Sequence, residues 1–522
     1  MKKKFLKSSN SSTVIFLVFL LAVNFLVSQK SLYLDLTQDK IYTASPVTKD
    51  ILGNLDKPVN VTFYISGDLP ADYVIYKTQV QDLVGQYSDL AQGKLEIKYE
   101  EPATDDTAVA ALEQSGIQQL QSQVVEKDKI EVKRFFFGAK ISSGEGEDEK
   151  KEVLSTLPEL ASFEYNFMAA VNSVSKEQKE IVAFLGGHGE KEINTAELEK
   201  SYEVEHVAIS AEEGKTGFYV DDQATADAET SDASKVEAPA EKEFVTPKTV
   251  IIAGPQSKLS EGEIAVLDGF VAGGGKVVVL AERINFDAEQ GFVTKNIDNN
   301  MSDFTKKYGI EINNDLVYDK SNSPISYGKQ TYFGTMTMTS DYPFWVKALQ
   351  ENFGDHPSLS KIQTLTLLWV SSLSVTGNDD YDVQSLVTST SGSQAISENI
   401  DISPESNLIF SNGGKKTLAA LSKAKNGEGQ VVVIADSDFV SPSFMQSTIP
   451  DNETFFLNLV DSISSSASLS SIRSKNISER PLREVSESAR NTWKFIALAG
   501  GAIILSAYGL MRINKRKKIS RG

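Results

Sequence analysis

Residues 249–282 read TVIIAGPQSKLSEGEIAVLDGFVAGGGKVVVLAE, and this stretch decides the expected fold. Two continuous apolar runs, TVIIA and KVVVL, flank a segment that we expect to be a helix. Apolar strands that alternate with helices are typical of a parallel sheet covered on both faces. Gly273–Gly275 follow the helix and precede a strand, and no GxxxxGK[ST] motif is present. We therefore expect these glycines to end the helix rather than to bind phosphate.

The same pattern continues on both sides of this stretch. Further strands and one amphipathic helix are expected in IVAFLGG (181–187), VEHVAI (204–209), QVVVIADSDF (430–439) and residues 452–463. We therefore expect a parallel-sheet α/β domain over residues 178–465. Residues 212–243 inside it are acidic and poor in large apolar side chains, so we expect a disordered insertion there.

Residues 32–177 show a different order of elements. A strand at 59–65 is followed by an amphipathic helix, a second strand, a second helix, a hairpin, and a final amphipathic helix that contains Phe163 and Phe167. This β-α-β-α-β-β-α order is that of a thioredoxin-like layer. Because the chain contains no cysteine, such a domain cannot carry out thiol chemistry, and we expect a binding or structural module.

The composition excludes several classes of function. The 522 residues include no cysteine and three histidines, which removes disulfides, thiolate zinc sites, iron–sulfur clusters and cysteine nucleophiles. The net charge is −19, and residues 30–492 alone carry a net charge of −30. A surface this acidic repels nucleic acid, whose binding depends on neutralising phosphates. We expect no nucleic-acid partner.

Both ends of the chain are apolar and basic. We expect residues 11–29 and 493–511 to form transmembrane helices, because each is close to the roughly 20 apolar residues that cross a bilayer. Residues 466–492 are expected to form a polar stalk. The basic flanks place both termini in the cytoplasm and the body of the protein outside. A cleaved signal peptide is the alternative for the first segment, and it also leaves the body outside.

Two short motifs follow apolar strands and could carry chemistry. GGHGE at 186–190 puts a histidine and a glutamate at a strand end, where open α/β sheets bind ligands. DSDFV at 436–440 has the DxDx[TV] spacing of haloacid-dehalogenase phosphotransferases. We hypothesise that both turns lie at neighbouring strand ends and shape one crevice. The candidate residues are Gly186, Gly187, His188, Glu190, Asp436 and Asp438.

These motifs do not complete a catalytic site. No HExxH or GxSxG motif is present, and one obvious helix and the stalk follow the aspartate pair, where phosphotransferases carry their other motifs. We therefore expect a chain that is not an enzyme and that has no metal and no cofactor. Two alternatives stay open. One is a membrane-anchored hydrolase or phosphatase that uses His188, Asp436 and Asp438 with a divalent cation, and the other is an envelope scaffold without a transporter.

Five segments, taken in order, carry a family resemblance. They are LDLTQDKIYTASPVTKDILGNLDKPVNVTFYIS, QVQDLVGQYSDLAQGKLEIKYEEP, FLGGHGE, VIIAGPQSKLSEGEIAVLDGFVAGGGKVVVL and IADSDF. Together they resemble the GldG-like auxiliary components of gliding-motility-associated ABC-type transport systems. The resemblance implies a thioredoxin-like domain and then a glutamine-amidotransferase-like (flavodoxin-like) domain that lacks the catalytic cysteine. It also implies a bacterial inner-membrane protein whose body lies in the periplasm or outside. No catalytic residue is carried over by it.

We therefore expect a non-enzymatic, membrane-anchored accessory subunit of an ABC transporter. The resemblance implies that it works with a separate ABC ATPase and a separate permease. Membrane lipid and an envelope component or unidentified substrate complete the expected partners.

Overall fold

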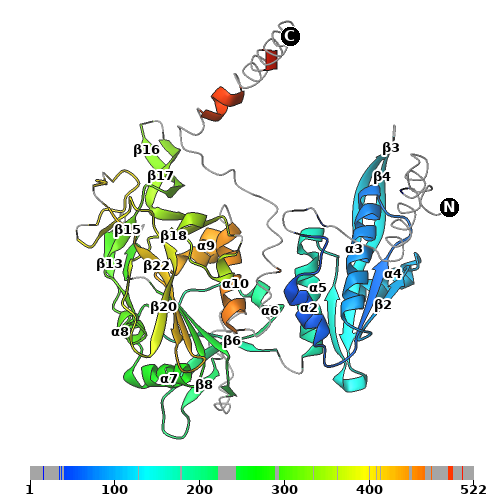
Figure 1. Cartoon of the computed structure of the whole chain (residues 1–522), viewed down its shortest axis with the longest axis horizontal. Helices are drawn as coiled ribbons and strands as arrows, with labels where there is room; N and C mark the ends of the chain where they lie inside the picture. Colours follow the sequence, from blue (N-terminus) through cyan, green and yellow to red (C-terminus); the bar gives the residue numbers. More distant parts are fainter. Residues whose placement is uncertain are drawn as a thin grey trace, which may run out of the picture. The chain divides into compact units, whose positions relative to one another are not determined.

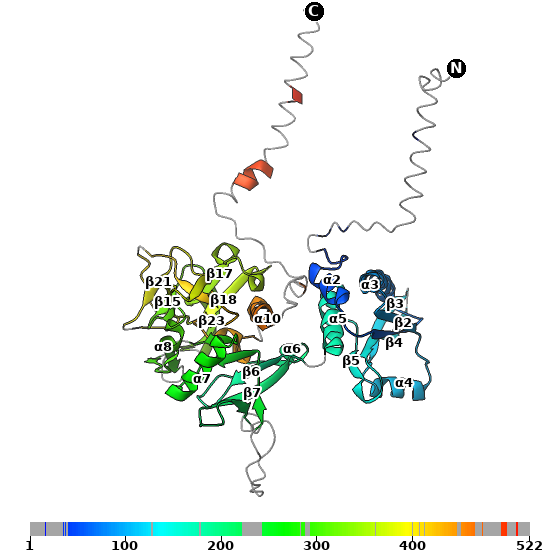
Figure 2. The same cartoon turned by 60° about the horizontal axis from the view of Figure 1, so that its bottom comes forward.

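The computed structural model describes most of the chain between residues 40 and 464. The gaps in that range are residues 127–128, 177–178, 222–242, 282, 288–292, 333, 361, 399, 407, 412 and 446–449. Outside it the described residues are Phe16, Asp35, Thr37, Ile472, 492–497 and 508–509. The chain divides into two compact units, Met1–Ile477 and Ser478–Gly522. The first unit contains an N-terminal domain and a central domain (Figures 1 and 2).

The N-terminal domain is built on a five-stranded sheet in the order β2-β1-β4-β3, with β5 also paired to β4. β1 and β2 are parallel, and the pairs made by β4 are antiparallel. The strands are β1 (Val59–Ile65), β2 (Leu95–Glu100), β3 (Gln119–Glu126), β4 (Lys129–Ser143) and β5 (Lys150–Leu154). The helices are α2 (Pro46–Gly53), α3 (Ala71–Leu90), α4 (Asp106–Gln114) and α5 (Leu160–Ser175).

The core of the N-terminal domain joins the sheet to α2, α3 and α5. Alternate residues of β1 are buried, and Phe63 stacks on Phe167 of α5. The buried carboxylate of Glu164 accepts hydrogen bonds from the backbone N of Ser45 (2.6 Å) and the hydroxyl of Thr48 (2.6 Å), which fixes α2 against α5. Ile472, within the segment expected to be a stalk, is also buried in this core.

The central domain contains an eleven-stranded sheet in the order β14-β19-β22-β23-β11-β10-β6-β7-β8-β9, with β20 paired to β22. Its middle strands β23, β11, β10, β6 and β7 are parallel, and antiparallel strands extend it on both sides. The bounds are β6 (Ile181–Leu185), β7 (Glu203–Ser210), β8 (Gly217–Val220), β9 (Phe244–Val245), β10 (Thr249–Ala253), β11 (Lys276–Leu280), β14 (Ile310–Ile312), β19 (Leu373–Val375), β20 (Tyr381–Thr388), β22 (Thr417–Ala424) and β23 (Gln430–Ile434).

Three smaller sheets and five helices complete the central domain. The strands are β12 (Ile284–Asp287) with β13 (Val293–Asn296), β15 (Leu316–Tyr318) with β21 (Gln394–Ile396), and β16 (Asn322–Thr331) with β17 (Gly334–Leu349) and β18 (Thr364–Leu368). The helices are α6 (Ala196–Glu199), α7 (Glu261–Ala272), α8 (Met301–Lys306), α9 (Pro442–Met445) and α10 (Pro450–Ser464). α7 lies against β7 and β11, and α10 lies against β10 and β18.

The connections around β6 position the candidate site. The chain adds β7 on one side of β6 and then β10, β11 and β23 on the other. This reversal makes the carboxyl ends of β6 and β10 a topological switch point, which is where open parallel sheets bind ligands.

The fold class expected from the sequence is wrong. Between residues 40 and 464 the described residues form 23 strands in five sheets and nine α-helices, so the protein is mostly β rather than a pair of thioredoxin-like and amidotransferase-like α/β domains. The physical reason is that the Ser/Thr/Tyr-rich residues after β15 pair as antiparallel strands. These strands lack the continuous apolar runs by which parallel strands are recognised in a sequence.

The two expected flanking transmembrane helices are part of the same correction. Among the residues that the structure describes, no helix has the length and apolar character needed to cross a membrane. Of the segments 11–29 and 493–511, all but Phe16 and residues 493–497 and 508–509 lie outside the described residues.

Part of the expected disordered insertion, residues 212–243, is ordered. Gly217–Val220 form β8, which pairs with β7, and Phe218 is buried against Phe270 of α7. One apolar side chain and a strand partner thus order this part, while residues 222–242 lie outside the described residues.

Candidate functional site

The GGHGE turn directly follows β6 at the switch point. Gly187 and Gly189 have φ of +101° and +77°, a left-handed conformation that favours glycine. A Cβ on Gly189 would lie 3.2 Å from the Cβ of Gln256, so the turn also packs closely on the loop after β10. The carbonyl oxygen of His188 accepts hydrogen bonds from the backbone N of Gln256 (2.8 Å) and Ser257 (3.1 Å). The glycines thus let two loops close on each other.

His188 lies between two glutamates. Its Nδ1 is 3.2 Å from Glu190 Oε1, and its Nε2 is 3.3 Å from Glu263 Oε1 in the first turn of α7. The hydrogen bond with Glu190 raises the pKa of His188; burial opposes this, and the charges of Glu190 and Glu263 add to it. The imidazole therefore holds a proton more readily than usual and ties the turn to α7.

Glu263 also belongs to the cap of α7. Burial alone would raise its pKa, but hydrogen bonds from Ser260 and the contact with His188 together lower it. Ser260 and Glu263 form a capping box, in which each side chain binds the other residue's backbone N. The glutamate that pairs with His188 is therefore also a residue that caps the N-terminus of α7.

Asp436 follows β23 and is fully buried. Its Oδ2 accepts a hydrogen bond from the backbone N of Leu368 (2.6 Å), and its Oδ1 accepts from the backbone N of Asp438 (2.7 Å) and Phe439 (3.2 Å). A carboxylate that receives three backbone hydrogen bonds holds the turn after β23 against the end of β18. A nucleophile needs access to its substrate, and this burial does not give it.

Asp438 pairs with the residue that follows GGHGE. Lys191 Nζ lies 2.7 Å from Asp438 Oδ1, and the backbone N of Lys191 donates to the carbonyl of Ala253 (2.7 Å). Beneath this pair, Gly254 has φ of +61°, and a Cβ there would lie 2.5 Å from the hydroxyl oxygen of Ser437. The structure thus brings the two predicted turns together at one edge of the sheet, although β10 and β11 lie between β6 and β23.

The polar groups of this edge bind one another. His188 contacts two glutamates, Asp438 contacts Lys191, and Asp436 holds backbone amides. Within the described parts of the chain, no group of three or more His, Cys, Asp or Glu side chains is placed to hold a metal ion. These contacts join four loops, those after β6, β10, β18 and β23, at the carboxyl edge of the sheet.

A hollow of about 920 Å³ lies beside the same edge, and we call it the amide-lined hollow. It is lined by Gln256, Ser257, Lys258, Asn285, Phe286, Thr294, Lys295, Asn296, Ile297 and Asp298. These residues come from the loop after β10 and from the β12–β13 hairpin with the loop that follows it. Sequence reasoning missed them. The run NIDNN at 296–300 could have indicated them, because it is rich in amide side chains. It comes after the parallel strand β11, from which only the short β12–β13 hairpin separates it.

An aromatic cluster supports one wall of the amide-lined hollow. The ring of Phe286 lies 4.4 Å, centroid to centroid, from the indole of Trp369. Trp369 has φ of +48°, a left-handed conformation that is rare for a bulky residue, and its Nε1 donates to the hydroxyl of Tyr342 (2.9 Å). It directly follows Leu368, whose backbone N is held by Asp436. The predicted residue Asp436 therefore helps to position this wall.

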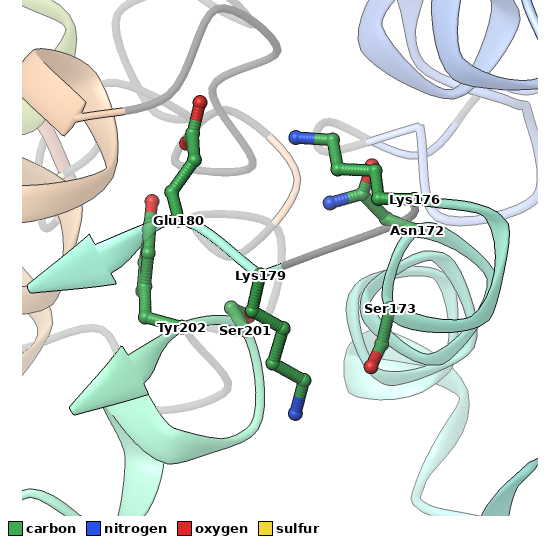
Figure 3. Close-up of a pocket in the computed structure, with 7 residues that line it drawn as sticks. All are labelled: Asn172, Ser173, Lys176, Lys179, Glu180, Ser201 and Tyr202. Carbon is green, nitrogen blue, oxygen red and sulfur yellow. The ribbon is translucent and has the colours of Figure 1, made fainter. Parts of the chain in front are cut away.

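A further hollow lies where the chain passes from α5 to β6 (Figure 3). It is lined by Asn172, Ser173, Lys176, Lys179, Glu180, Ser201 and Tyr202. It has room for about one water molecule. Lys179 contacts Glu152 (3.5 Å) and the carbonyl of Glu199 (3.1 Å), so its charge is engaged locally. This hollow is too small for a substrate.

Comparison with known proteins identifies the family. The family model described as an ABC-type uncharacterized transport system matches residues 179–459, which is more than half of the chain. This chain belongs to that family. As a member of this ABC-transport family, it has an accessory role in an ABC-type transport system. Residues 38–142 match another family model, described as a domain of unknown function.

One relative and two solved structures also match the chain. An uncharacterized protein of Borreliella burgdorferi is 23% identical over 534 residues, which covers 97% of this chain and 97% of that protein. The mmIFT52 N-terminal domain matches 54% of this chain and 95% of its own, at 15% identity and a TM-score of 0.32. The exo-beta-1,4-mannosidase Op5Man5 from Opitutaceae bacterium strain TAV5 matches 70% of this chain and 45% of its own, at 11% identity and a TM-score of 0.20.

Proposed function

We propose that this member of the ABC-transport family is a non-enzymatic accessory subunit that binds a separate ABC ATPase and permease. The observation that carries the proposal is the family match over residues 179–459. The resemblance of FLGGHGE and IADSDF to GldG-like components supports the finer assignment to the gliding-motility type.

The state of the chemistry-bearing side chains supports a role without catalysis. Asp436 is fully buried and binds backbone amides through its carboxylate, and Asp438 and His188 each face a different partner. A phosphotransferase needs an exposed aspartate nucleophile beside a bound cation. The carboxyl edge instead has the features of a rigid joint between loops.

The β16–β17 hairpin is the surface that we propose for contact with the permease, through which the ATPase is recovered as well. Residues 322–340 carry a single charge, Lys329, which pairs with Glu405. Among the described residues of this hairpin, three large apolar side chains are exposed, with Tyr332 at 97%, Met336 at 54% and Met338 at 40%. Figure 1 shows the hairpin projecting from the central domain.

The two faces of the hairpin differ in polarity. The strand register pairs Tyr327 with Met338 and Lys329 with Met336, so the methionines share a face. Ser326 pairs with Thr339 on the opposite face, where their hydroxyl groups lie 2.9 Å apart. Exposed methionine and tyrosine on an almost uncharged surface of an acidic protein are typical of a protein contact site.

Purification of the tagged full-length chain in mild detergent, with mass spectrometry of its partners, tests this proposal. We expect an ABC ATPase and a multi-span permease to be recovered in amounts comparable with the chain. The double variant Met336→Asp/Met338→Asp should lose at least about 90% of both partners, because two buried charges at an interface cost several kcal/mol.

The matched control is Thr337→Asp/Thr339→Asp, which adds the same charge to the opposite face of β17. It should keep both partners. Equal recovery with both double variants would contradict the hairpin contact, and recovery of the wild-type chain without either subunit would contradict the accessory role.

We also propose that the protein works at the bacterial inner membrane, in contact with lipid, with both termini in the cytoplasm and its folded domains in the periplasm. The support is in the sequence, where the acidic body lies between basic ends. Binding of an envelope component or substrate by the folded domains belongs to the same proposal. Protease added to intact spheroplasts should cleave the central domain; protection until the cells are lysed would contradict this orientation.

A further inference from the structure

One edge of the β16–β17 hairpin is open. β17 pairs with β16 along one edge, and β18 takes the other edge only from Trp345 to Leu349. After β18 the chain turns away, since Trp369 has φ of +48° and the carbonyl of Val370 accepts from the backbone N of Val317 in β15. Among the described residues, no strand pairs with this edge of β17 between Gly334 and Asp341.

The open edge lacks the features that usually protect a strand edge. Every residue from Gly334 to Thr339 is exposed. An open edge presents backbone N–H and C=O groups that can pair with another strand, and proteins usually block it with charged residues or proline. β16, on the far side of the hairpin, carries Pro324 and Lys329, whereas residues 334–340 contain neither a charge nor a proline. The open edge of β17 can therefore accept a partner strand.

The sequence along the open edge is the same in both directions. Thr335–Thr339 read TMTMT, with Thr337 at the centre. Thr331 pairs with Gly334 across the turn, and hydrogen-bonded pairs alternate with non-hydrogen-bonded pairs from there. The two methionines therefore direct their backbone groups to β16, and the three threonines direct theirs to the open edge. In an antiparallel pair of two copies centred on Thr337, threonine lies opposite threonine and methionine opposite methionine.

We propose that the open edge of β17 pairs with the same edge of a second copy of this chain. The two-fold axis passes through the Thr337 pair, and the two hairpins form a four-stranded sheet in the order β16-β17-β17-β16. A two-fold dimer needs one surface that is complementary to itself, and the TMTMT edge has this property. The inference goes beyond the accessory role and does not depend on it, because the proposed permease contact uses the face with Met336 and Met338 rather than the edge.

The distribution of charge favours a second copy at this edge. Residues 30–492 carry a net charge of −30, so two copies repel one another wherever their acidic surfaces meet. Residues 322–340 carry a single charge, Lys329, which lies on β16 and pairs with Glu405. Two copies therefore meet along β17 without opposed like charges, and facing threonines are a favourable cross-strand pair. Because the contact is small, we expect a dimer that dissociates on dilution.

Cross-linking through a single cysteine tests the pairing, because the chain contains no cysteine of its own. Thr337→Cys is made in the full-length chain, purified alone in detergent and treated with a short bis-maleimide. In the proposed dimer the two Cα atoms at this position lie about 5.5 Å apart. Ser326→Cys is the matched control, at an exposed residue of β16 whose two copies lie roughly 20 Å apart. We expect at least about tenfold more cross-linked dimer from Thr337→Cys, since pairing raises the local concentration of the second thiol.

A further pair of variants tests the register. Thr335 lies opposite the partner's Thr339 in the proposed pairing. An equal mixture of Thr335→Cys and Thr339→Cys, carrying different tags, should therefore cross-link between the two variants. Within either variant alone the two Cα atoms lie roughly 14 Å apart, so each should cross-link less by itself. Equal cross-linking in the separate and mixed samples would overturn a pairing centred on Thr337.

Thr337→Pro tests the same contact without a cross-linker. Proline removes the outward N–H and leaves the hydrogen bonds to β16, so the hairpin should stay folded. Light scattering should show that the wild-type chain forms a dimer as its concentration rises and that Thr337→Pro stays monomeric. Thr337→Val keeps the N–H and a β-branched side chain, so it should form the dimer as the wild type does.

Three results would overturn the dimer. They are no more cross-linking in Thr337→Cys than in Ser326→Cys, a dimer in Thr337→Pro as strong as in the wild type, and cross-linking of Thr337→Cys to the permease instead of to a second copy. The accessory role is decided separately, by the recovery of ATPase and permease. Thr337→Asp/Thr339→Asp places like charges opposite each other and should break the dimer, yet it should keep both transporter subunits.

Discussion

The carboxyl edge of the parallel sheet carries two neighbouring regions with opposite character. In one region, GGHGE and the turn after β23 hold a histidine and two aspartates that are engaged with protein groups. In the other, the amide-lined hollow presents amides and an aromatic ring around open space. The GGHGE region has the residue types of an active site and acts as a joint, whereas the sequence of the hollow is that of an ordinary loop. Residue type alone therefore does not distinguish a side chain that lines open space from one that binds its neighbours.

The largest effect that tests this difference concerns Asp436. Asp436→Ala leaves three backbone N–H groups without their acceptor in a buried place, so it should lower the free energy of unfolding by roughly 3–5 kcal/mol. Urea denaturation, followed by circular dichroism, measures the change. Asp436→Asn keeps one acceptor oxygen and should cost less.

The control for this prediction is Asp438→Ala. Its ion pair with Lys191 is about one-fifth exposed, and its loss should cost about 1 kcal/mol or less. If Asp436→Ala stays within about 0.5 kcal/mol of the wild type, the carboxylate is not structural and the contrast between the two regions is broken.

The smallest effect is the pH dependence that His188 contributes. Because its pKa is raised in the folded state, its contribution to stability is complete below about pH 6.5 and is lost as the pH rises through the raised pKa. Unfolding measured from pH 5 to pH 9 should therefore show a loss of stability at the upper end that is absent in His188→Gln.

His356 provides a comparison with the opposite sign. Burial lowers its pKa, with the charge of Asp355 opposing, so its contribution is present above about pH 6.5 and is lost as the pH falls. His356→Gln should flatten the acidic side of the profile and leave the basic side unchanged. If His188→Gln also alters only the acidic side, His188 is not held between two carboxylates as the structure has it.

Strong periodicity made part of the central domain readable from the sequence. The β10–α7–β11 segment follows the quoted stretch, and Gly273–Gly275 end α7 as expected, with Gly274 at φ of +95°. The predicted strands at β6 and β23 could be read for the same reason, since each is a run of four or five buried apolar residues. Continuous apolar runs and a glycine end are local features, and local features survive in any tertiary context.

The fold as a whole could not be read in this way. β16 and the first half of β17, up to Asp341, are rich in Ser, Thr and Tyr and bury no side chain, so no apolar period marks them. β3 was missed because its pairing with β4 is a tertiary contact rather than a property of QLQSQVVE. The amide-lined hollow was missed for a similar reason, since Gln256 and Asn285 are 29 positions apart in the sequence and meet only in the folded chain.

One series of unfolding measurements compares the two regions directly. The full-length wild type, Asp436→Ala and Asn296→Ala are each unfolded with urea and followed by circular dichroism. We predict that Asp436→Ala lowers the free energy of unfolding by roughly 3–5 kcal/mol, because Asp436 is fully buried and binds backbone amides, and that Asn296→Ala, at an exposed residue, stays within about 0.5 kcal/mol of the wild type. Equal losses of stability in the two variants would contradict the difference between the two regions.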